Sequence, residues 1–461
     1  MNKMIKNHAG FIMSRKTFIK GTVILTAAGI LTRIMGFFFR IMLSRATGAE
    51  GMGMYQLVMP VLAVCTAAGI SGFEVAVSRL CAYYTSRNDR NTAAVYSVLC
   101  FTGSIIICSV CTLFVYRYAG IIAIYILHNS ACTPLIKTSI LSLPFSCIHI
   151  IVCSHFIGRD KIWLPALSQL LEQAVRILSV YILIKIYIKS GEPCDASIGT
   201  AGLVIGEIFS AVLCAEVIIC HKKSYVKYLL PSDNNALPDV SRGGKLFPYI
   251  REVHKTAFPV SVNRILLHLL QSVEAALIPM MLKIYGYGHS EAMSVYGIVT
   301  GMAMPIILFP STLTNSVSTL LLPSISRVSD SYRALKKSGG SSLLFSLTFG
   351  FLCIIAFLTV GAPAGAYLFN EPSLSEYIRV LAWLCPLISI TATFKSMLHA
   401  LGQTALVLGN SMLSEAVNIV FIVVLVPRFG ISAYLTGLLA SQAVSAALCL
   451  AGFKRSISRI S

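Results

Sequence analysis

The sequence predicts an all-α protein that crosses a membrane repeatedly, with about 12 transmembrane helices in two pseudo-symmetric six-helix lobes. Of its 461 residues, 56% are hydrophobic and only 12% are charged, whereas about a quarter of the residues in a soluble domain are charged. Apolar runs long enough to cross a bilayer recur along the whole chain. The second half of the chain also repeats features of the first, which predicts two related lobes.

The apolar runs define the individual spans, because about 20 consecutive apolar residues cross the hydrocarbon core as a helix. The predicted spans are residues 20–43, 55–80, 92–117, 133–157, 163–187, 197–220, 252–282, 292–322, 341–361, 377–399, 405–426 and 431–452. The first run carries arginines and is long, so we interpret it as an uncleaved span rather than a signal peptide.

The distribution of basic residues predicts how the chain lies in the cell membrane. The net charge is +19, and its Lys and Arg residues gather on alternate short loops, as cytoplasmic loops do. This bias places both termini in the cytoplasm and requires an even number of spans. The basic residues are scattered and no soluble module holds them, so we expect no nucleic-acid partner.

A hydrophilic stretch divides the chain near its midpoint. Residues 221–251 are rich in polar and basic residues, and we interpret them as a cytoplasmic linker. The predicted domains are therefore an N-terminal lobe of residues 1–220 and a C-terminal lobe of residues 252–461. The linker is too short to hold a catalytic domain.

The two halves repeat in the same order. GLVIGEIFSAVLC at 202–214 aligns with GLLASQAVSAALC at 437–449, with six identities in 13 positions. The offset across an even number of spans predicts a parallel repeat about an axis along the membrane normal, with the substrate site between the halves. Arg176 corresponds to Asn418 in this alignment, so the first lobe is the more cationic at that position.

The first span carries a stripe that is unusual for a helix in lipid. Gly29, Arg33, Gly36 and Arg40 fall within about 60° on a helix. An arginine at the bilayer centre costs at least about 3 kcal/mol, so the stripe is expected to face protein or water. The two guanidinium groups, about 10.5 Å apart along the axis, are able to converge on a phosphate-bearing ligand. The alternative is that both arginines pair with acidic residues of neighbouring helices.

Two further basic positions lie inside predicted spans. Glu172 and Arg176 are four residues apart with the acid first, the favourable order for a helical ion pair. We interpret this pair as structural or gating, and contact with substrate is the alternative. Arg264 lies in the seventh span and is a candidate for the central cavity. Glu274 is ten residues away and about 80° off its face, so a direct pair is not expected.

Three more acidic residues lie inside predicted spans, namely Glu74, Glu207 and Glu415. An intramembrane carboxylate is a functional candidate by default, so each is a candidate site for a coupling ion, either Na⁺ or H⁺. The alternative is that each pairs with an arginine of another helix.

The sequence offers nothing for catalysis or for a cofactor. Most of the 14 cysteines lie in apolar spans, where they pack as small hydrophobic residues and predict no metal site. We find no phosphate-binding glycine loop, zinc-protease motif or nucleophile elbow. We therefore predict that the protein is not an enzyme and needs no cofactor.

Three stretches together resemble a known family. They are GTVILTAAGILTRIMGFFFR at 21–40, GRDKIWLPALSQLLEQAVRI at 158–177 and PSTLTNSVSTLLLPSIS at 310–326. They are similar to the polysaccharide-transport branch of the multidrug/oligosaccharidyl-lipid/polysaccharide exporter superfamily, over residues 14–452. The resemblance implies that Arg33 and Arg40 correspond to arginines that grip a lipid-linked pyrophosphate.

The chain departs from that family in three ways. Many relatives have two more spans, and these form a groove for the lipid tail in lipid II flippases. Such flippases also carry an arginine early in the second span, where this chain has none. Glu74 stands where relatives have an apolar residue or proline.

The resemblance and the arginine stripe together predict a flippase. It would move an undecaprenyl-pyrophosphate-linked saccharide, a peptidoglycan precursor such as that of the spore cortex, across the membrane by alternating access. Arg33, Arg40 and Arg264 would bind the pyrophosphate, and membrane lipids would hold the tail. An ion-coupled multidrug exporter of the same superfamily is one alternative, which predicts an acidic cavity. A membrane glycosyltransferase or polymerase is another, which predicts large loops with catalytic side chains.

Overall fold

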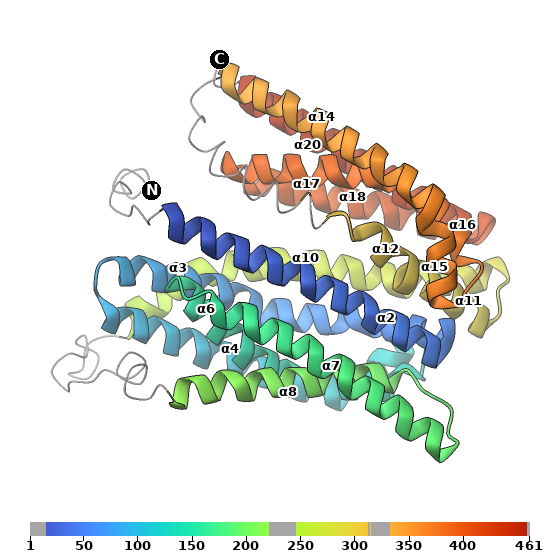
Figure 1. The fold of residues 1–461 in the computed structure, drawn as a ribbon, viewed down its shortest axis with the longest axis horizontal. Helices are drawn as coiled ribbons and strands as arrows, with labels where there is room; N and C mark the ends of the chain where they lie inside the picture. The colour runs from blue at the N-terminus through green and yellow to red at the C-terminus, as the bar shows by residue number, and fades with distance from the viewer. Residues whose placement is uncertain (1–14, 221–245, 312–313, 315–331, 459–461) are drawn as a thin grey trace.

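The computed structural model describes residues 15–220, 246–311, 314 and 332–458, and within these ranges the chain is helical and contains no strand (Figure 1). The elements are α2 (Arg15–Thr66), η1 (Ala67–Ser71), α3 (Gly72–Ser86), α4 (Arg90–Ile121), η2 (Ile122–Ile126), α5 (Cys132–Ile140), α6 (Leu143–Gly158), α7 (Trp163–Ser190), α8 (Ser197–Cys220), α10 (Phe247–Tyr285), α11 (His289–Tyr296), η4 (Gly297–Ala303), α12 (Met304–Leu308), α14 (Tyr332–Ala356), η5 (Phe357–Gly361), α15 (Ala362–Phe369), α16 (Leu374–Leu381), α17 (Leu384–Ala400), α18 (Thr404–Val424), α19 (Val426–Phe429) and α20 (Ile431–Ser458).

The helices confirm the predicted all-α membrane fold. In the described residues, 9 helices are long and apolar enough to cross a membrane, or 10 if the bent pair α16–α17 counts as one span. The longest of these stretches, from α2 to α3, contains the first two predicted spans, because Gly48 breaks α2 with φ 72°. Glycine adopts this left-handed conformation without a steric penalty. The predicted span 292–322 runs partly outside the described residues.

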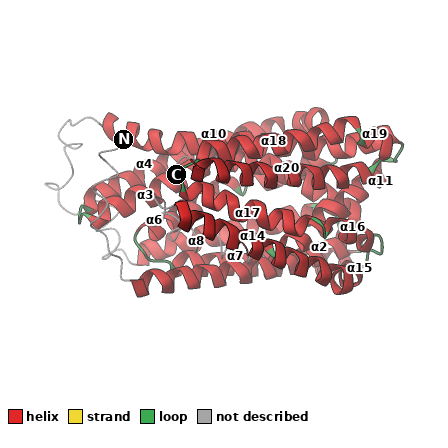
Figure 2. Cartoon of the chain, turned by 90° about the horizontal axis from the view of Figure 1, so that it is seen from above, coloured by secondary structure: helices red, strands yellow, loops and turns green. Residues whose placement is uncertain are grey.

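The first and second halves of the chain form two groups of helices (Figures 1 and 2). The helices α2 to α8 make one group, and α14, α17, α18 and α20 lie in the other, with α10 packed against α2, α3 and α18. The start of α2 and the end of α20 lie at the same end of the bundle, which we call the terminal end. The opposite end, where α11, α15 and α16 lie, is the distal end.

The hydrophobic core shows where the two groups are joined. The largest cluster of buried apolar side chains includes Leu43 and Met52 of α2 together with Met293 and Tyr296 of α11, so it is continuous across both groups. Two smaller clusters each lie within one group. One is built around Phe156, Leu164 and Cys214, and the other around Leu335, Phe394 and Phe453. The groups are thus packed together distally. Toward the terminal end α10 continues the main core against α3 and α4, while α14, α17 and α20 have a core of their own.

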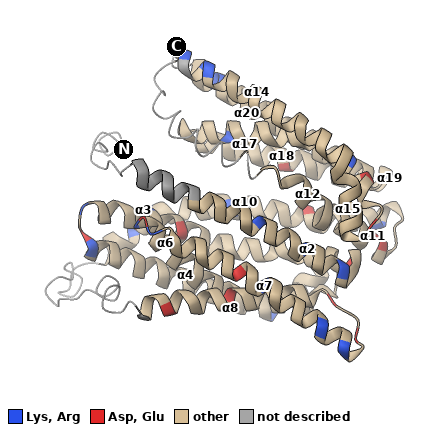
Figure 3. Ribbon diagram, in the orientation of Figure 1, with Lys and Arg blue, Asp and Glu red and all other residues tan. Residues whose placement is uncertain are grey.

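The outer surface is suited to lipid. Leu113 and Phe114 of α4 are 72% and 59% exposed, and many other large apolar side chains are exposed along the helices. Charged residues gather mainly toward the two ends of the bundle, whereas the middle of most helices carries few (Figure 3). A belt of this kind is expected of helices that cross a bilayer.

The predicted linker is corrected at one end. Residues 247–251 are the first turn of α10 rather than part of a connecting segment. Pro248 lies in this first turn, where a missing backbone N–H costs nothing. Residues 221–245 of the predicted linker lie outside the described residues, and the exact domain boundaries remain a prediction.

Candidate functional site

The part of the arginine stripe that contains Gly29, Arg33 and Gly36 is not packed against other helices. Arg33 is exposed, and a Cβ atom built on Gly29 or Gly36 meets no atom within 4 Å. Within the described residues, no acidic side chain forms an ion pair with Arg33 or Arg40. The stripe therefore leaves open space for a ligand. The alternative of acidic partners on neighbouring helices finds no support there.

Arg40 lies where the stripe reaches the distal packing of the two groups. Its Nη1 donates to the carbonyl oxygen of Gly301 in η4, 3.2 Å away. Farther along α2, Gln56 Nε2 donates to the carbonyl of Thr300, at 3.1 Å. Both acceptors belong to a π-helical segment, in which hydrogen bonds between residues five apart replace the regular i→i−4 hydrogen bonds. The segment thereby presents carbonyl groups to side chains of the other half of the chain.

Glycines allow the backbones to approach closely at this junction. A Cβ atom on Gly53 would lie 2.2 Å from the carbonyl oxygen of Met293, and one on Gly297 would lie 2.1 Å from that of Ala49. Any side chain at either position would force the helices apart. The distal junction between α2 and the α11–η4 segment is therefore a tight one.

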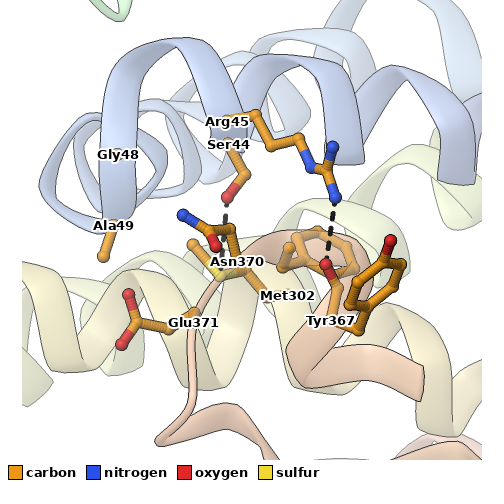
Figure 4. A pocket seen from close by; sticks show the side chains of 9 residues that line it. Ser44, Arg45, Gly48, Ala49, Met302, Tyr367, Asn370 and Glu371 are labelled. Carbon is orange, nitrogen blue, oxygen red and sulfur yellow. Dashed lines mark hydrogen bonds between the residues drawn. The ribbon is translucent and has the colours of Figure 1, made fainter. Parts of the chain in front are cut away.

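A polar pocket of about 370 Å³ opens beside this junction (Figure 4). Arg45 Nε donates to the carbonyl of Leu368 at 2.6 Å, and its Nη2 donates to that of Tyr367 at 3.0 Å. These carbonyls lie at the end of α15, which Asn370 terminates with φ 57°. Because the last carbonyls of a helix lack intrahelical donors, Arg45 satisfies two of them and ties α2 to α15.

Arg264 and Glu74 come together across the two halves. Arg264 Nη1 lies 3.3 Å from Ser71 Oγ and 3.8 Å from Glu74 Oε2. The two charged side chains are 47% and 40% exposed, so the contact is open. Glu74 thus has the arginine partner that the sequence left as its alternative role. Arg264 and Glu274 form no ion pair, as expected from their helical phase, in the part of the chain that the structure describes.

The predicted pair of Glu172 and Arg176 belongs to a larger cluster in the N-terminal half. Arg176 Nη2 donates to Glu172 Oε1 and lies 3.9 Å from Glu207 Oε1. His149 of α6 faces both acids, with Nδ1 at 3.6 Å from Glu172 and 3.7 Å from Glu207. Sequence reasoning missed His149. The available signal was a histidine in the middle of an otherwise apolar span, which is as unusual there as a carboxylate.

The C-terminal half contains a corresponding polar cluster. Glu274 of α10 accepts hydrogen bonds from Asn418 Nδ2 at 2.7 Å and from Tyr434 Oη at 3.3 Å. The side chain of Glu415 also lies within hydrogen-bonding range of Glu274. Asn418 and Arg176, which the repeat aligns, thus both belong to intramembrane polar clusters.

Comparison with known proteins identifies the family. The model of the polysaccharide biosynthesis protein family matches residues 18–329, more than half of the chain. The chain belongs to this family. It is 26% identical to stage V sporulation protein B of Bacillus subtilis over 91% of this chain and 80% of that protein. It is 21% identical to the lipid II flippase MurJ of the same organism, over 83% of this chain and 72% of that protein.

Solved structures place this family member in the predicted superfamily fold. An inward-facing MATE family transporter of the MOP superfamily matches with a TM-score of 0.71 and 13% identity, over 93% of this chain and 95% of that one. An outward-facing MATE transporter matches with a TM-score of 0.64 and 14% identity, over 96% of each chain. These matches show that the chain has the fold of the MATE transporters, as the sequence predicted.

Proposed function

We propose that the protein is a flippase for an undecaprenyl-pyrophosphate-linked saccharide, and specifically for a peptidoglycan precursor used in the spore cortex. The observation that carries the proposal is the arginine stripe of α2, which is open around Arg33 and has no acidic partner among the described residues. The similarity to stage V sporulation protein B and to a lipid II flippase supports the substrate class.

Chemistry explains why arginines suit this role. A pyrophosphate carries several oxygen acceptors, and the planar guanidinium group binds such oxygens in bidentate pairs. Arg33 and Arg40 are separated by two helical turns, about 10.5 Å along the axis, and their long side chains converge on one group placed between them. Arg264 is half exposed beside Glu74. It would bind the pyrophosphate together with Arg33 and Arg40 once the pyrophosphate displaces the carboxylate of Glu74.

Transport would occur by alternating access. We assign the terminal end to the cytoplasm, so the separate core of α14, α17 and α20 there corresponds to an inward-open state and the tight distal junction to a closed outer side. The higher TM-score with the inward-facing transporter agrees with this assignment. The orientation is tested with a cysteine introduced at position 240. If a membrane-impermeant reagent labels this cysteine from outside intact cells, the assigned orientation is wrong.

The test of the proposal is a leaflet-translocation assay in proteoliposomes with fluorescent lipid II. Arg33→Ala and Arg40→Ala should abolish translocation while protein abundance in the membrane stays near that of the wild type. Arg33→Lys and Arg40→Lys should retain part of the activity, because lysine keeps the charge and loses the planar fork. Normal translocation by the double alanine variant would disprove the pyrophosphate role.

A second candidate is export of a multidrug substrate, which the MATE fold of the solved relatives favours. A cationic drug would require acidic groups in the cavity. Glu74 of α3, which lies opposite Arg264 of α10, is a half-exposed acid of this kind. Glu74→Gln should then abolish drug efflux, whereas in the flippase it should free Arg264 and leave translocation of lipid II largely intact.

A further inference from the structure

The cluster of ionisable side chains in the N-terminal half is nearly enclosed. His149 of α6, Glu172 and Arg176 of α7, and Glu207 of α8 have side chains that are only 6%, 10%, 13% and 14% exposed. Gly202 and Gly206 of α8 permit the close packing of α7 and α8, since a Cβ atom on Gly206 would lie 3.3 Å from the backbone carbonyl of Glu172. Four ionisable groups are thus held together inside an apolar lobe.

The fixed charges of this cluster do not balance. Glu172 and Glu207 carry two negative charges, and Arg176 carries one positive charge. Arg176 is hydrogen-bonded to Glu172, while Glu207 Oε2 has no hydrogen-bond partner and its nearest further cation is His149. A buried charge without compensation is strongly unfavourable. The cluster is therefore neutral only when it holds one more positive charge.

The surroundings of His149 identify that charge as a proton. Its Nδ1 faces both carboxylates, and its Nε2 lies 3.0 Å from Ser168 Oγ. Ser168 donates its own hydroxyl proton to the carbonyl of Pro165 at 3.2 Å, so its oxygen accepts from Nε2. Both ring nitrogens then face acceptors, which is the pattern of a protonated imidazole.

The other groups near the ring do not change this balance. Cys153 of α6 contacts Ser168 at 3.3 Å, and Cys214 of α8 lies on the same side. Both are free cysteines, and we treat both as protonated thiols. The helices α3 and α4 also pack against α6, and their polar side chains, Cys81 and Ser97, contact His155. His155 is a buried histidine of the same helix that lies outside the cluster.

We propose that His149, Glu172 and Glu207 form a binding site for one exchangeable proton that drives the change between inward-open and outward-open states. The proton binds to the imidazole from water and returns to water, and no other bond is made or broken. Its loss leaves one uncompensated negative charge between α6, α7 and α8. Because α7 also packs against α2, which carries the arginine stripe, this charge acts on the transport helix directly. The proposal deepens the proposed transport function and rests on alternating access.

The proposal is tested by a distance measurement that needs no substrate. Spin labels on unnatural amino acids at Ser86 of α3 and Lys336 of α14, both exposed at the terminal end, report how far the two halves are separated. The distance distribution of the wild-type protein should change as the pH is raised from about 6 to about 11, because the two facing carboxylates favour the protonated imidazole beyond the range in which free histidines titrate. His149→Gln should abolish this change. Glu207→Gln should abolish it too, because the remaining Glu172 and Arg176 already balance.

Matched controls separate this site from its rivals. His155→Gln alters a buried histidine of the same helix and should leave the pH response intact. Cys153→Ser removes a thiol beside His149 that would otherwise help to hold a soft metal ion, and it should also leave the response intact.

A wild-type distribution that is independent of pH would overturn the proposal, as would a normal response in both His149→Gln and Glu207→Gln. Loss of the response in Cys153→Ser and after chelation of zinc would identify a metal site instead. If the wild-type protein shows the pH response but does not translocate lipid II, the proposed substrate is wrong and the proposed proton site still stands.

Discussion

At the scale of single residues, the environment of each arginine separates its role. Arg33 is open, Arg40 and Arg45 donate to carbonyl groups across the distal junction, and Arg176 is held by carboxylates within one lobe. The same residue type therefore serves the proposed ligand binding at Arg33 and Arg40, the junction at Arg40 and Arg45, and internal charge balance at Arg176. Only the last of these roles makes a side chain essential for folding, because its removal leaves buried carboxylates unpaired.

Arg176 is accordingly predicted to be a stability residue. Arg176→Met should destabilise the protein by about 3–5 kcal/mol, because it leaves Glu172 without its partner inside the lobe. Adding Glu172→Gln should restore most of the lost stability, since the acid that was stranded is then neutral. Reversible unfolding in mixed detergent micelles measures both effects. Equal stability of the wild type and Arg176→Met would show that Glu172 does not depend on this partner.

Sequence reasoning found the ionisable residues better than it found their partners. The apolar runs made Glu172, Arg176 and Glu207 conspicuous, and the i,i+4 spacing was enough to predict the Glu172–Arg176 pair. The approach of α6 depends on how the helices are rotated about their axes, which no local pattern encodes. The contacts of His149 with Glu172 and Glu207, and the choice of Arg264 as the partner of Glu74, therefore could not be derived from the sequence.

At the scale of elements, the hydropathy of the sequence predicted where the helices lie but did not predict where their regular α-helical geometry is interrupted. Runs of apolar residues predicted each candidate span among the described residues, since about 20 apolar residues are needed to cross the bilayer. The predicted span 163–187, which is α7, is helical but is not among the stretches apolar enough to cross. The π-helical segments η1, η2, η4 and η5 were not predicted. Their sequences look like ordinary apolar helix, and tertiary contacts such as those of Arg40 and Gln56 with η4 decide the local geometry.

The close glycine contacts yield a prediction about the distal junction. Gly53→Ala places a Cβ atom 2.2 Å from the carbonyl oxygen of Met293, so it should separate α2 from α11 and destabilise the closed junction by about 1–3 kcal/mol. Gly36→Ala on the same helix meets no atom within 4 Å and is the matched control, with unchanged or slightly increased stability. Thermal unfolding of the two variants in detergent compares them. A Gly36→Ala variant as unstable as Gly53→Ala would mean that the stripe is packed in the membrane.

At the scale of the whole molecule, the two halves are joined distally through α2 and α11. Toward the terminal end α10 packs against α3, and α14, α17 and α20 have a core of their own. Ser290 Oγ donates to Glu50 at the distal end, and Arg45 bonds to the end of α15 nearby. These contacts involve exposed side chains, which are worth little individually in stability. Such contacts break at small cost, as the distal end of an alternating-access transporter requires. The closed junction is therefore one state of a two-state element rather than a permanent interface.

This view predicts that a covalent link at the distal end stops transport. Glu50→Cys and Ser290→Cys should be bridged by a short bifunctional thiol reagent, because the two native side chains are in hydrogen-bond contact. The bridged protein should remain folded and lose translocation of fluorescent lipid II. Each single-cysteine variant treated with the same reagent should stay active, which controls for the modification itself. Cleaving a reducible version of the reagent should restore activity. Full transport by the bridged protein would mean that the distal junction stays closed throughout the cycle, and the substrate would then have to leave by a path that does not separate α2 from α11.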